Sequence, residues 1–380
     1  MPAWGRPPRQ AAPRACVDFQ HGYKKHLALS CEGWPLARRA LDVALCYFEG
    51  SFLLMPELPE VETVARGLRQ AILGRRIVSV RLGKTDFIDD PAALEQHLPG
   101  RQIEAVERYG KFILLRLSAV NRETRAAANG DAAQASLLVH LGMTGQIAPS
   151  PAGRVLQKHT HVCILMDDGR ELRYTDARRF GRIAYLTKAL LAEELTGFGT
   201  DPLEVSEMEF ASRICGRRAR IKALLLDQSV LRGIGNIYAD ESLWKAKIHP
   251  ARLGAKLSRK QAETLRRVLR HILQKAIVLR GSSISDFLDA KGEPGEYQRH
   301  HRAYGREGKS CYRCKTPIRR AMVAGRSSYF CPTCQHSPRG FAALPLLGKN
   351  ARKNKRTEAS TGSGKRRAQR NRSAEMGNHL

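Results

Sequence analysis

The stretch MPELPEVE, from Met55 to Glu62, decides how the chain begins to fold. Its prolines suit the first turn of a helix, and its glutamates suit the positive end of a helix dipole. Apolar residues then recur at helical spacing until Gly74 ends the run. These residues are Val61, Val64, Leu68 and Ile72. We therefore predict one long helix over residues 58–73.

The stretch also reads like the start of a protein, although 54 residues precede it. Residues 1–54 contain Pro/Arg clusters and only weak periodicity, so we predict no domain there. We interpret this extension as a wrongly assigned start, as a removable segment or as disordered chain.

Alternating, β-branched segments follow the helix, which is typical of strands. They occupy residues 75–82, 101–109, 111–117, 136–142, 160–166, 170–176 and 181–186. Between Ser118 and Ala135 the chain is polar and Ala-rich, and we predict a surface insertion there. The pattern predicts a β-sandwich carrying the long helix, with a domain boundary near residue 187.

Helical patterns replace the strands after Pro202. We expect helices near residues 206–214, 221–227, 236–246 and 258–279. The chain is therefore predicted to be α+β, with a β-sandwich over 55–187, a helical domain over 188–305 and a Cys-rich module over 306–336. Residues 345–380 are rich in Lys, Arg, Ser, Gly and Asn, and we predict a disordered basic tail.

Charge points to a polyanionic partner. Lys and Arg number 65 against 36 Asp and Glu, which gives a net charge of +29. Such a balance favours DNA or RNA as partner. No apolar run is long enough to span a membrane, no basic amphipathic helix is evident, and Met1–Ser30 lacks a secretory apolar core. We expect a cytoplasmic protein without a membrane partner.

Four of the nine cysteines form two CxxC steps, at Cys311, Cys314, Cys331 and Cys334. The pattern C-x2-C-x16-C-x2-C is typical of a zinc ribbon in a reducing compartment. Four thiolates leave no open coordination position, so one structural Zn²⁺ is predicted.

Three motifs in this order resemble the bacterial formamidopyrimidine-DNA glycosylases. They are PELPEVE from Pro56, GIGNIYADESLW over Gly233–Trp244, and YGREGKSC before the zinc ribbon. The resemblance covers about residues 55–335. It implies a helix–two-turn–helix in the helical domain, a monomer, and an enzyme that excises oxidised purines from duplex DNA and then nicks the abasic site.

The resemblance also implies the catalytic residues. Pro56 is the expected nucleophile, which forms a Schiff base with the sugar. An α-amino group is more often neutral at pH 7 than a lysine, but with residues 1–54 attached the Pro56 nitrogen is an amide and cannot attack. Glu57 resembles the general acid, Glu60 a supporting carboxylate, Lys111 the β-elimination lysine and Arg326 the δ-elimination arginine.

Seven further residues are expected to hold DNA. Met143 and Phe180 resemble wedges that fill the gap left by a flipped base, and Arg178 resembles the reader of the orphaned cytosine. Lys222 and Asn236 resemble a phosphate clamp, with the N–H groups at the helix start facing a phosphate. His159 and Arg217 match further DNA contacts. Residues 281–298 resemble a loop that closes over the flipped base.

Three alternatives stay open at this point. One is a related, endonuclease VIII-like glycosylase for oxidised pyrimidines. Another is a non-catalytic binder of damaged DNA, if the extension is retained. The third, a ribosome-associated zinc-ribbon protein, leaves PELPEVE and GIGNIYADESLW unexplained.

Overall fold

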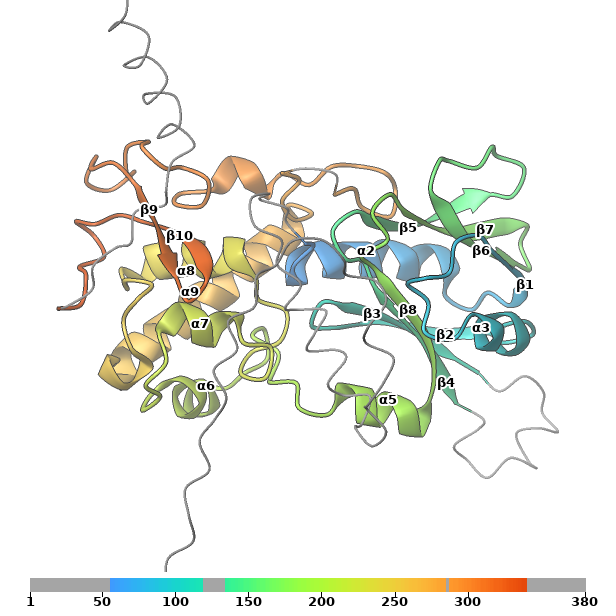
Figure 1. Ribbon diagram of the computed structural model, residues 1–380, viewed down its shortest axis with the longest axis horizontal. Helices are drawn as coiled ribbons and strands as arrows, with labels where there is room; N and C mark the ends of the chain where they lie inside the picture. Colours follow the sequence, from blue (N-terminus) through green and yellow to red (C-terminus); the bar gives the residue numbers. More distant parts are fainter. Residues whose placement is uncertain (1–54, 119–133, 285–286, 340–380) are drawn as a thin grey trace, which may run out of the picture. The chain divides into compact units, whose positions relative to one another are not determined.

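The computed structural model describes residues 55–118, 134–284 and 287–339 (Figure 1). The predicted extension over 1–54, most of the predicted insertion and the predicted tail over 345–380 lie outside the described residues.

The long N-terminal helix is present as α2 (Leu58–Ile72), within one residue of the prediction. Its apolar stripe is buried, and Val61, Val64 and Leu68 are each at most 1% exposed. The carboxylate of Glu60 accepts a hydrogen bond from the backbone N–H of Glu57 at 3.0 Å, which satisfies one of the N–H groups at the helix start.

The predicted β-sandwich is confirmed as two antiparallel sheets of four strands each. One sheet has the order β1 (Ile77–Leu82), β6 (Thr160–Met166), β7 (Arg170–Asp176) and β5 (Gly145–Pro151). The other has the order β2 (Ile103–Tyr109), β3 (Phe112–Leu117), β4 (Ala135–His140) and β8 (Arg182–Thr187). Apolar residues of both sheets and of α2 share one core, as expected for packed layers.

Three elements of this domain were not predicted: α3 (Pro91–His97), β5 and α5 (Lys188–Leu195). Prolines at 149 and 151 hide β5, which tolerates them because it is an edge strand. Helix α5 packs Leu191 against the outer face of the second sheet. Leu138 of β4 belongs to the same cluster, and every residue of β4 is buried.

The helical half contains α6 (Glu207–Ile214), α7 (Ile221–Leu226), α8 (Asn236–Ala246) and α9 (Arg259–Val278), close to the predicted ranges. Short 3₁₀ turns lie at η1 (Gly254–Lys256) and η2 (Tyr297–His300). These helices share a second core with the zinc ribbon and with Leu58 of α2. Among the helices that the structure describes, none combines the length and apolarity needed to cross a membrane.

The Cys-rich module contains the hairpin β9 (Arg319–Val323) and β10 (Arg326–Phe330), and it lies against α8. Arg313 donates hydrogen bonds of 2.7 Å to the carbonyls of both Trp244 and Lys245, at the C-terminal end of α8. Its guanidinium also lies 4.1 Å from the centre of the Trp244 ring. A cation at the negative end of a helix is favourable, so the module is fixed to this helix.

Candidate active site and DNA-binding surface

Glu57 joins α2 to the start of α8. Its carboxylate accepts hydrogen bonds from the backbone N–H groups of Gly235 and Ile237, both at 2.9 Å, and of Tyr238 at 3.4 Å. The N–H groups at a helix start form an anion site, and here the anion is a side chain of the protein itself. The expectation that these N–H groups face a phosphate is therefore wrong for these three.

This contact requires a glycine at position 235. A Cβ there would lie 2.2 Å from the Glu57 carboxyl carbon, which no real contact allows. The backbone N–H of Leu58 also donates to the Gly233 carbonyl at 2.9 Å. The GIGN motif is thus shaped to receive the N-terminal end of α2.

Glu60 lies behind Glu57 and connects α2 to two other segments. Its carboxylate accepts hydrogen bonds from the Tyr238 hydroxyl at 2.5 Å and from the Ser282 backbone N–H at 2.6 Å. Gly281 has a positive φ of 78°, and a Cβ there would approach the Glu60 carboxylate to 2.7 Å. Glu60 therefore anchors the start of the predicted lesion-capping loop to the helix that carries Pro56.

Burial raises the pKa of both carboxyl groups. Burial and the neighbouring charge of Glu57 raise the pKa of Glu60 to about 7. Burial also raises the pKa of Glu57, although Lys111 and the three N–H donors act against it. A carboxyl that keeps its proton near neutral pH can act as a general acid.

The raised pKa of Glu60 predicts a pH-dependent difference in stability. A folded state that holds a proton more tightly than the unfolded state loses stability as pH rises, here between about 4.5 and 7. Glu60→Gln removes this loss. Relative to wild type, the variant's free energy of unfolding should rise by about 3 kcal/mol between pH 4.5 and 8, since one pKa unit corresponds to about 1.4 kcal/mol. Urea unfolding across this range measures the difference. A difference in free energy of unfolding between variant and wild type that stays constant with pH would contradict the prediction. The exposed Glu95→Gln variant is the control, and its difference from wild type should stay constant with pH.

Lys111 belongs to the tight turn between β2 and β3, where Tyr109 pairs with Phe112. Burial lowers the pKa of Lys111, although the carboxylates of Glu57 and Glu60 act in the opposite direction. His140 of β4 is buried nearby, and burial and Lys111 lower its pKa to about 4. A carboxyl group with a raised pKa therefore lies close to an amine with a lowered pKa. Titratable groups whose pKa values are shifted in this way are typical of acid–base sites.

Pro56 is buried at the wall of a pocket. The pocket brings together α2, the turn after β4, the start of α8 and the loop after α9. Its lining residues are Met55, Pro56, Glu60, Met143, Ile237, Ser282, Ile284 and Phe287. The nucleophile, one carboxyl group, one wedge residue and the loop expected from the sequence thus meet at one cavity.

The predicted wedge and reader residues are brought together by a buried carboxylate. Asp176 accepts hydrogen bonds from the Thr144 hydroxyl at 2.5 Å and from the backbone N–H of Arg178 at 3.2 Å and of Gly181 at 2.9 Å. It thereby links the turn that carries Met143 to the turn that carries Phe180. The Phe180 ring is 49% exposed, with the Arg178 guanidinium 4.7 Å from its centre. An exposed aromatic ring on a fixed turn is suited to insertion between bases.

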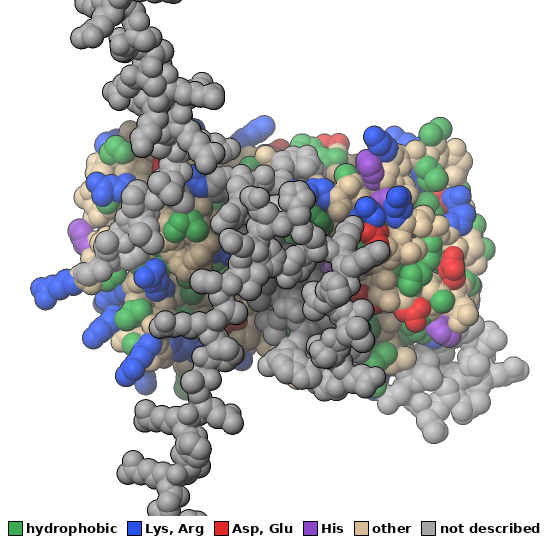
Figure 2. Space-filling model, viewed as in Figure 1, with side chains coloured by type: hydrophobic (Ala, Val, Ile, Leu, Met, Phe, Trp, Pro, Cys, Tyr) green, Lys and Arg blue, Asp and Glu red, His purple; other side chains and the backbone are tan. Residues whose placement is uncertain are grey.

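The remaining predicted DNA contacts lie in different environments. His159 is exposed with a left-handed backbone, and its carbonyl accepts from the Asp176 N–H at 3.0 Å. Arg217 is exposed in the segment between α6 and α7. The Asn236 amide donates to the Ser327 carbonyl at 3.1 Å. Arg326 is half-buried, and burial lowers its pKa to about 10. Figure 2 shows Lys and Arg side chains gathered over the helical half and the zinc module.

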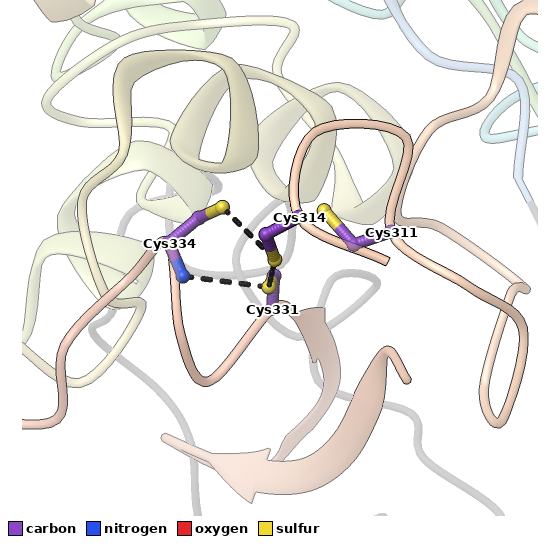
Figure 3. Close-up of side chains that lie close together, drawn as sticks. All are labelled: Cys311, Cys314, Cys331 and Cys334. Carbon is purple, nitrogen blue, oxygen red and sulfur yellow. Dashed lines mark hydrogen bonds between the residues drawn. The ribbon is translucent and has the colours of Figure 1, made fainter. Parts of the chain in front are cut away.

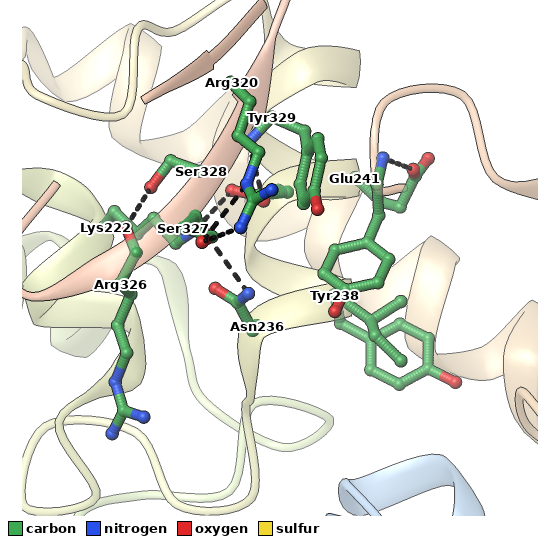
Figure 4. A network of polar contacts seen from close by, with 12 residues as sticks. Lys222, Asn236, Tyr238, Glu241, Arg320, Arg326, Ser327, Ser328 and Tyr329 are labelled. Carbon is green, nitrogen blue, oxygen red and sulfur yellow. Dashed lines mark hydrogen bonds and ion pairs between the residues drawn. The ribbon is translucent and has the colours of Figure 1, made fainter. Parts of the chain in front are cut away.

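Lys222 differs most from its expected setting. Its side chain is fully buried, and its ammonium forms an ion pair of 2.7 Å with Asp240 (Figure 4). It also donates a hydrogen bond of 2.7 Å to the Ser327 carbonyl. The structure therefore gives this ammonium no exposed surface for a phosphate, in contrast to the expected clamp.

The four predicted zinc ligands converge, as Figure 3 shows. All four sulfurs lie within 4.8 Å of one another, with Cys314 3.4 Å from Cys331 and 3.5 Å from Cys334. Tetrahedral Zn²⁺ with bonds of about 2.3 Å would place its sulfurs about 3.8 Å apart. The set therefore fits one structural zinc ion, held by the two CxxC steps.

Removing one zinc ligand is expected to release the ion. Cys331 is fully buried, and the binding of a structural zinc ion contributes to the free energy of folding. Cys331→Ser should lower bound zinc from one per chain to well below half, and lower the melting temperature. Metal analysis and calorimetry measure these changes. Cys215→Ser is the matched control, because Cys215 is half-buried outside the cluster. Full zinc retention by Cys331→Ser would contradict the assignment.

The sequence did not identify Tyr238, Ser282 or Asp176 as parts of the site. Tyr238 and Ser282 bind Glu60, and Asp176 orders the turns that carry Met143 and Phe180. Tyr238 stands within the GIGNIYADESLW motif, which was the available signal. A buried carboxylate such as Asp176 has no signature in the sequence of its own turn.

Comparison with known proteins agrees with this architecture. The formamidopyrimidine-DNA glycosylase N-terminal domain matches residues 55–183, the formamidopyrimidine-DNA glycosylase H2TH domain matches 198–288, and the zinc finger found in FPG and IleRS matches 308–336.

The chain is 42% identical over 286 residues to the formamidopyrimidine-DNA glycosylase of Herpetosiphon aurantiacus, covering 74% of this chain and all of that protein. The Solibacter usitatus enzyme of the same name is also 42% identical, over 284 residues, covering 74% of this chain and 99% of the relative. The MutM (FPG) structure from Thermus thermophilus superposes with a TM-score of 0.63 at 37% identity, covering 74% of this chain and all of that one. The structure of a Lactococcus lactis FPG mutant bound to Fapy-dG containing DNA superposes with a TM-score of 0.65 at 32% identity, covering 74% of this chain and all of that one. The chain belongs to the formamidopyrimidine-DNA glycosylase family.

Proposed function

We propose that this chain excises oxidised purines, 8-oxoguanine and formamidopyrimidines, from duplex DNA and then cleaves the strand as an abasic-site lyase. The observation that carries the proposal is the pocket that joins Pro56 to Glu60 and Met143, beside a Glu57 fixed on α8. Related structures hold DNA that contains Fapy-dG, carbocyclic 8-oxo-G or an abasic site, which supports these substrates. We further propose that it acts as a monomer in the cytoplasm.

In the proposed reaction the Pro56 nitrogen attacks the sugar C1′. The bond between C1′ and the base breaks, and the base leaves with the bonding electrons. Glu57 supplies the proton for ring opening or for the leaving base, which its raised pKa supports. The attached Pro56 nitrogen then loses its proton, the C1′–O4′ bond breaks, and O4′ leaves as a hydroxyl after taking up a proton. This leaves an iminium between Pro56 and C1′, which withdraws electrons from the sugar.

Strand cleavage follows from the same iminium. Loss of a proton from C2′ expels the 3′ phosphate, and a second elimination expels the 5′ phosphate. Lys111 is proposed to serve the first elimination, since its lowered pKa favours proton exchange. Arg326 is proposed to hold a phosphate oxygen during the second. All of these steps require a Pro56 nitrogen that is not part of a peptide bond.

A panel of lesion duplexes tests the substrate class. Single-turnover cleavage of 8-oxoguanine opposite cytosine should exceed cleavage of duplexes with an oxidised pyrimidine, and undamaged duplex should remain intact. A related Lactococcus lactis structure holds DNA with an oxidised pyrimidine, so that class is the second candidate. Preferential cleavage of duplexes with an oxidised pyrimidine would contradict the proposed substrate class and support the second candidate. Tight lesion binding without cleavage would instead indicate a damage-binding protein.

A further inference from the structure

A buried polar group joins α7 and α8 to the outer edge of the zinc hairpin. Lys222 of α7 and Asp240 of α8 form an ion pair of 2.7 Å, and both side chains are fully buried. The Lys222 ammonium donates to the Ser327 carbonyl at 2.7 Å, and the Asp240 carboxylate accepts from the Tyr329 N–H at 2.9 Å. We name Lys222 and Asp240 the strand bracket.

In the part of the chain that the structure describes, the bracket occupies the edge of β10 where a third strand could pair. In the two-stranded hairpin, β9 pairs with one edge of β10 only. Along one edge of an antiparallel strand, the N–H and C=O groups of alternate residues point outward. Ser327 and Tyr329 are such alternate residues, and the bracket supplies the donor and the acceptor that they require. Asn236 adds a second donor to Ser327, at 3.1 Å.

Arg326 immediately precedes this fixed segment. Figure 4 shows its side chain extending away from Lys222, while the Ser327 carbonyl accepts hydrogen bonds from Lys222 of α7 and Asn236 of α8. The same helix α8 binds Glu57 at its first turn. The bracket therefore fixes the strand that presents Arg326 to the helix that presents the proposed general acid.

We propose that Lys222 is a positioning residue: with Asp240 it holds β10 so that Arg326 reaches the reacting phosphate, and it does not bind DNA itself. This inference rests on the proposed role of Arg326 in the second elimination. It assigns a different role to a lysine whose place in the sequence motif suggested a phosphate contact.

The test uses whichever chain cleaves DNA, the full chain or the chain starting at Met55. The variants are Lys222→Met and the double variant Lys222→Met with Asp240→Leu, which removes both charges and keeps apolar volume. Lys260→Met is the control, because Lys260 is exposed on α9. On a preformed abasic duplex, the ratio of second- to first-elimination product should fall at least tenfold in both bracket variants. Zinc content and folding should persist in the double variant, and the control should match wild type.

Making the Lys222→Met substitution in an Arg326→Ala variant distinguishes a Lys222 that positions Arg326 from a Lys222 that contacts DNA directly. There, Lys222→Met should leave the elimination ratio and the salt dependence of duplex binding unchanged. If Lys222 bound a phosphate itself, the slope of log affinity against log salt would become shallower by about one. That result, or a normal elimination ratio in the double variant, would overturn the inference.

Hydrogen exchange keeps this inference separate from the proposed function. The Tyr329 N–H should exchange at least tenfold faster in the double variant than in wild type, whether or not the chain cleaves DNA. If neither wild-type chain cleaved an abasic duplex, that result would contradict the proposed function. An unchanged exchange rate of the Tyr329 N–H in the double variant would contradict the proposed role of the strand bracket.

Discussion

Glu57→Gln is expected to slow base excision by about 10²–10⁴-fold, the usual contribution of a general acid. The glutamine keeps the shape of the side chain but has no proton of comparable acidity to give. Burial raises the pKa of Glu57, and the charge of Lys111 acts in the opposite direction. Single-turnover excision of 8-oxoguanine, measured at saturating enzyme, gives the rate of the chemical step.

Two controls isolate chemistry from folding in this variant. Glu57 also accepts three backbone hydrogen bonds, so the variant should melt at a lower temperature. Assays well below that temperature, with lesion binding measured in parallel, remove this effect. Glu263→Gln, at an exposed position on α9, should excise normally. An excision rate for Glu57→Gln within threefold of wild type would show that the proton comes from elsewhere.

Keeping residues 1–54 joined to Pro56 through Met55 is expected to abolish excision and strand cleavage. An amide nitrogen shares its lone pair with the carbonyl, so it cannot attack C1′. α-Amino groups have a reference pKa of about 7.7–8.0, well below that of lysine, so a terminal amine is more often neutral at pH 7 than a lysine is. The chain that starts at Met55, once that methionine is removed, should therefore cleave, and the chain that starts at Met1 should cleave only if it is processed.

Lesion binding provides the control for that comparison. The wedge residues and the ordered turn around Asp176 are the same in both chains, so both should bind a lesion duplex if the pocket stays open. Cleavage at equal rates by an intact Met1 chain, verified by mass, would contradict the requirement for a free nitrogen. Edman sequencing of the active chain would identify its first residue.

Local pattern was enough to predict most elements of the fold. The apolar repeat of α2, the alternating strands and the CxxC spacing all depend on near neighbours in the sequence. Helix α5 was missed because it is short, and its inward residues Leu191 and Leu195 leave a weak helical pattern. Strand β5 was missed because its prolines usually exclude a strand, and only its edge position permits them.

In the site, too, features that depend on near neighbours in the sequence were predicted, and features that depend on distant segments were not. Motifs marked Pro56, Glu57 and the cysteines, but contacts between distant segments could not be predicted from spacing. Glu57 binds residues about 180 positions away, which reverses the expected role of the N–H groups at the start of α8. Lys222 has the sequence setting of a surface cation, and only the buried Asp240 one helix later explains its burial.

Borohydride reduction during reaction tests the central claim most directly. Incubating the Met55-starting chain with an 8-oxoguanine:cytosine duplex and borohydride should give a covalent protein–DNA band, and peptide mapping should locate the bond at the nitrogen of Pro56. The Met1 chain should give no such band unless its extension is removed. A bond mapped to Lys111, or no band from either chain despite tight lesion binding, would contradict Pro56 as the nucleophile.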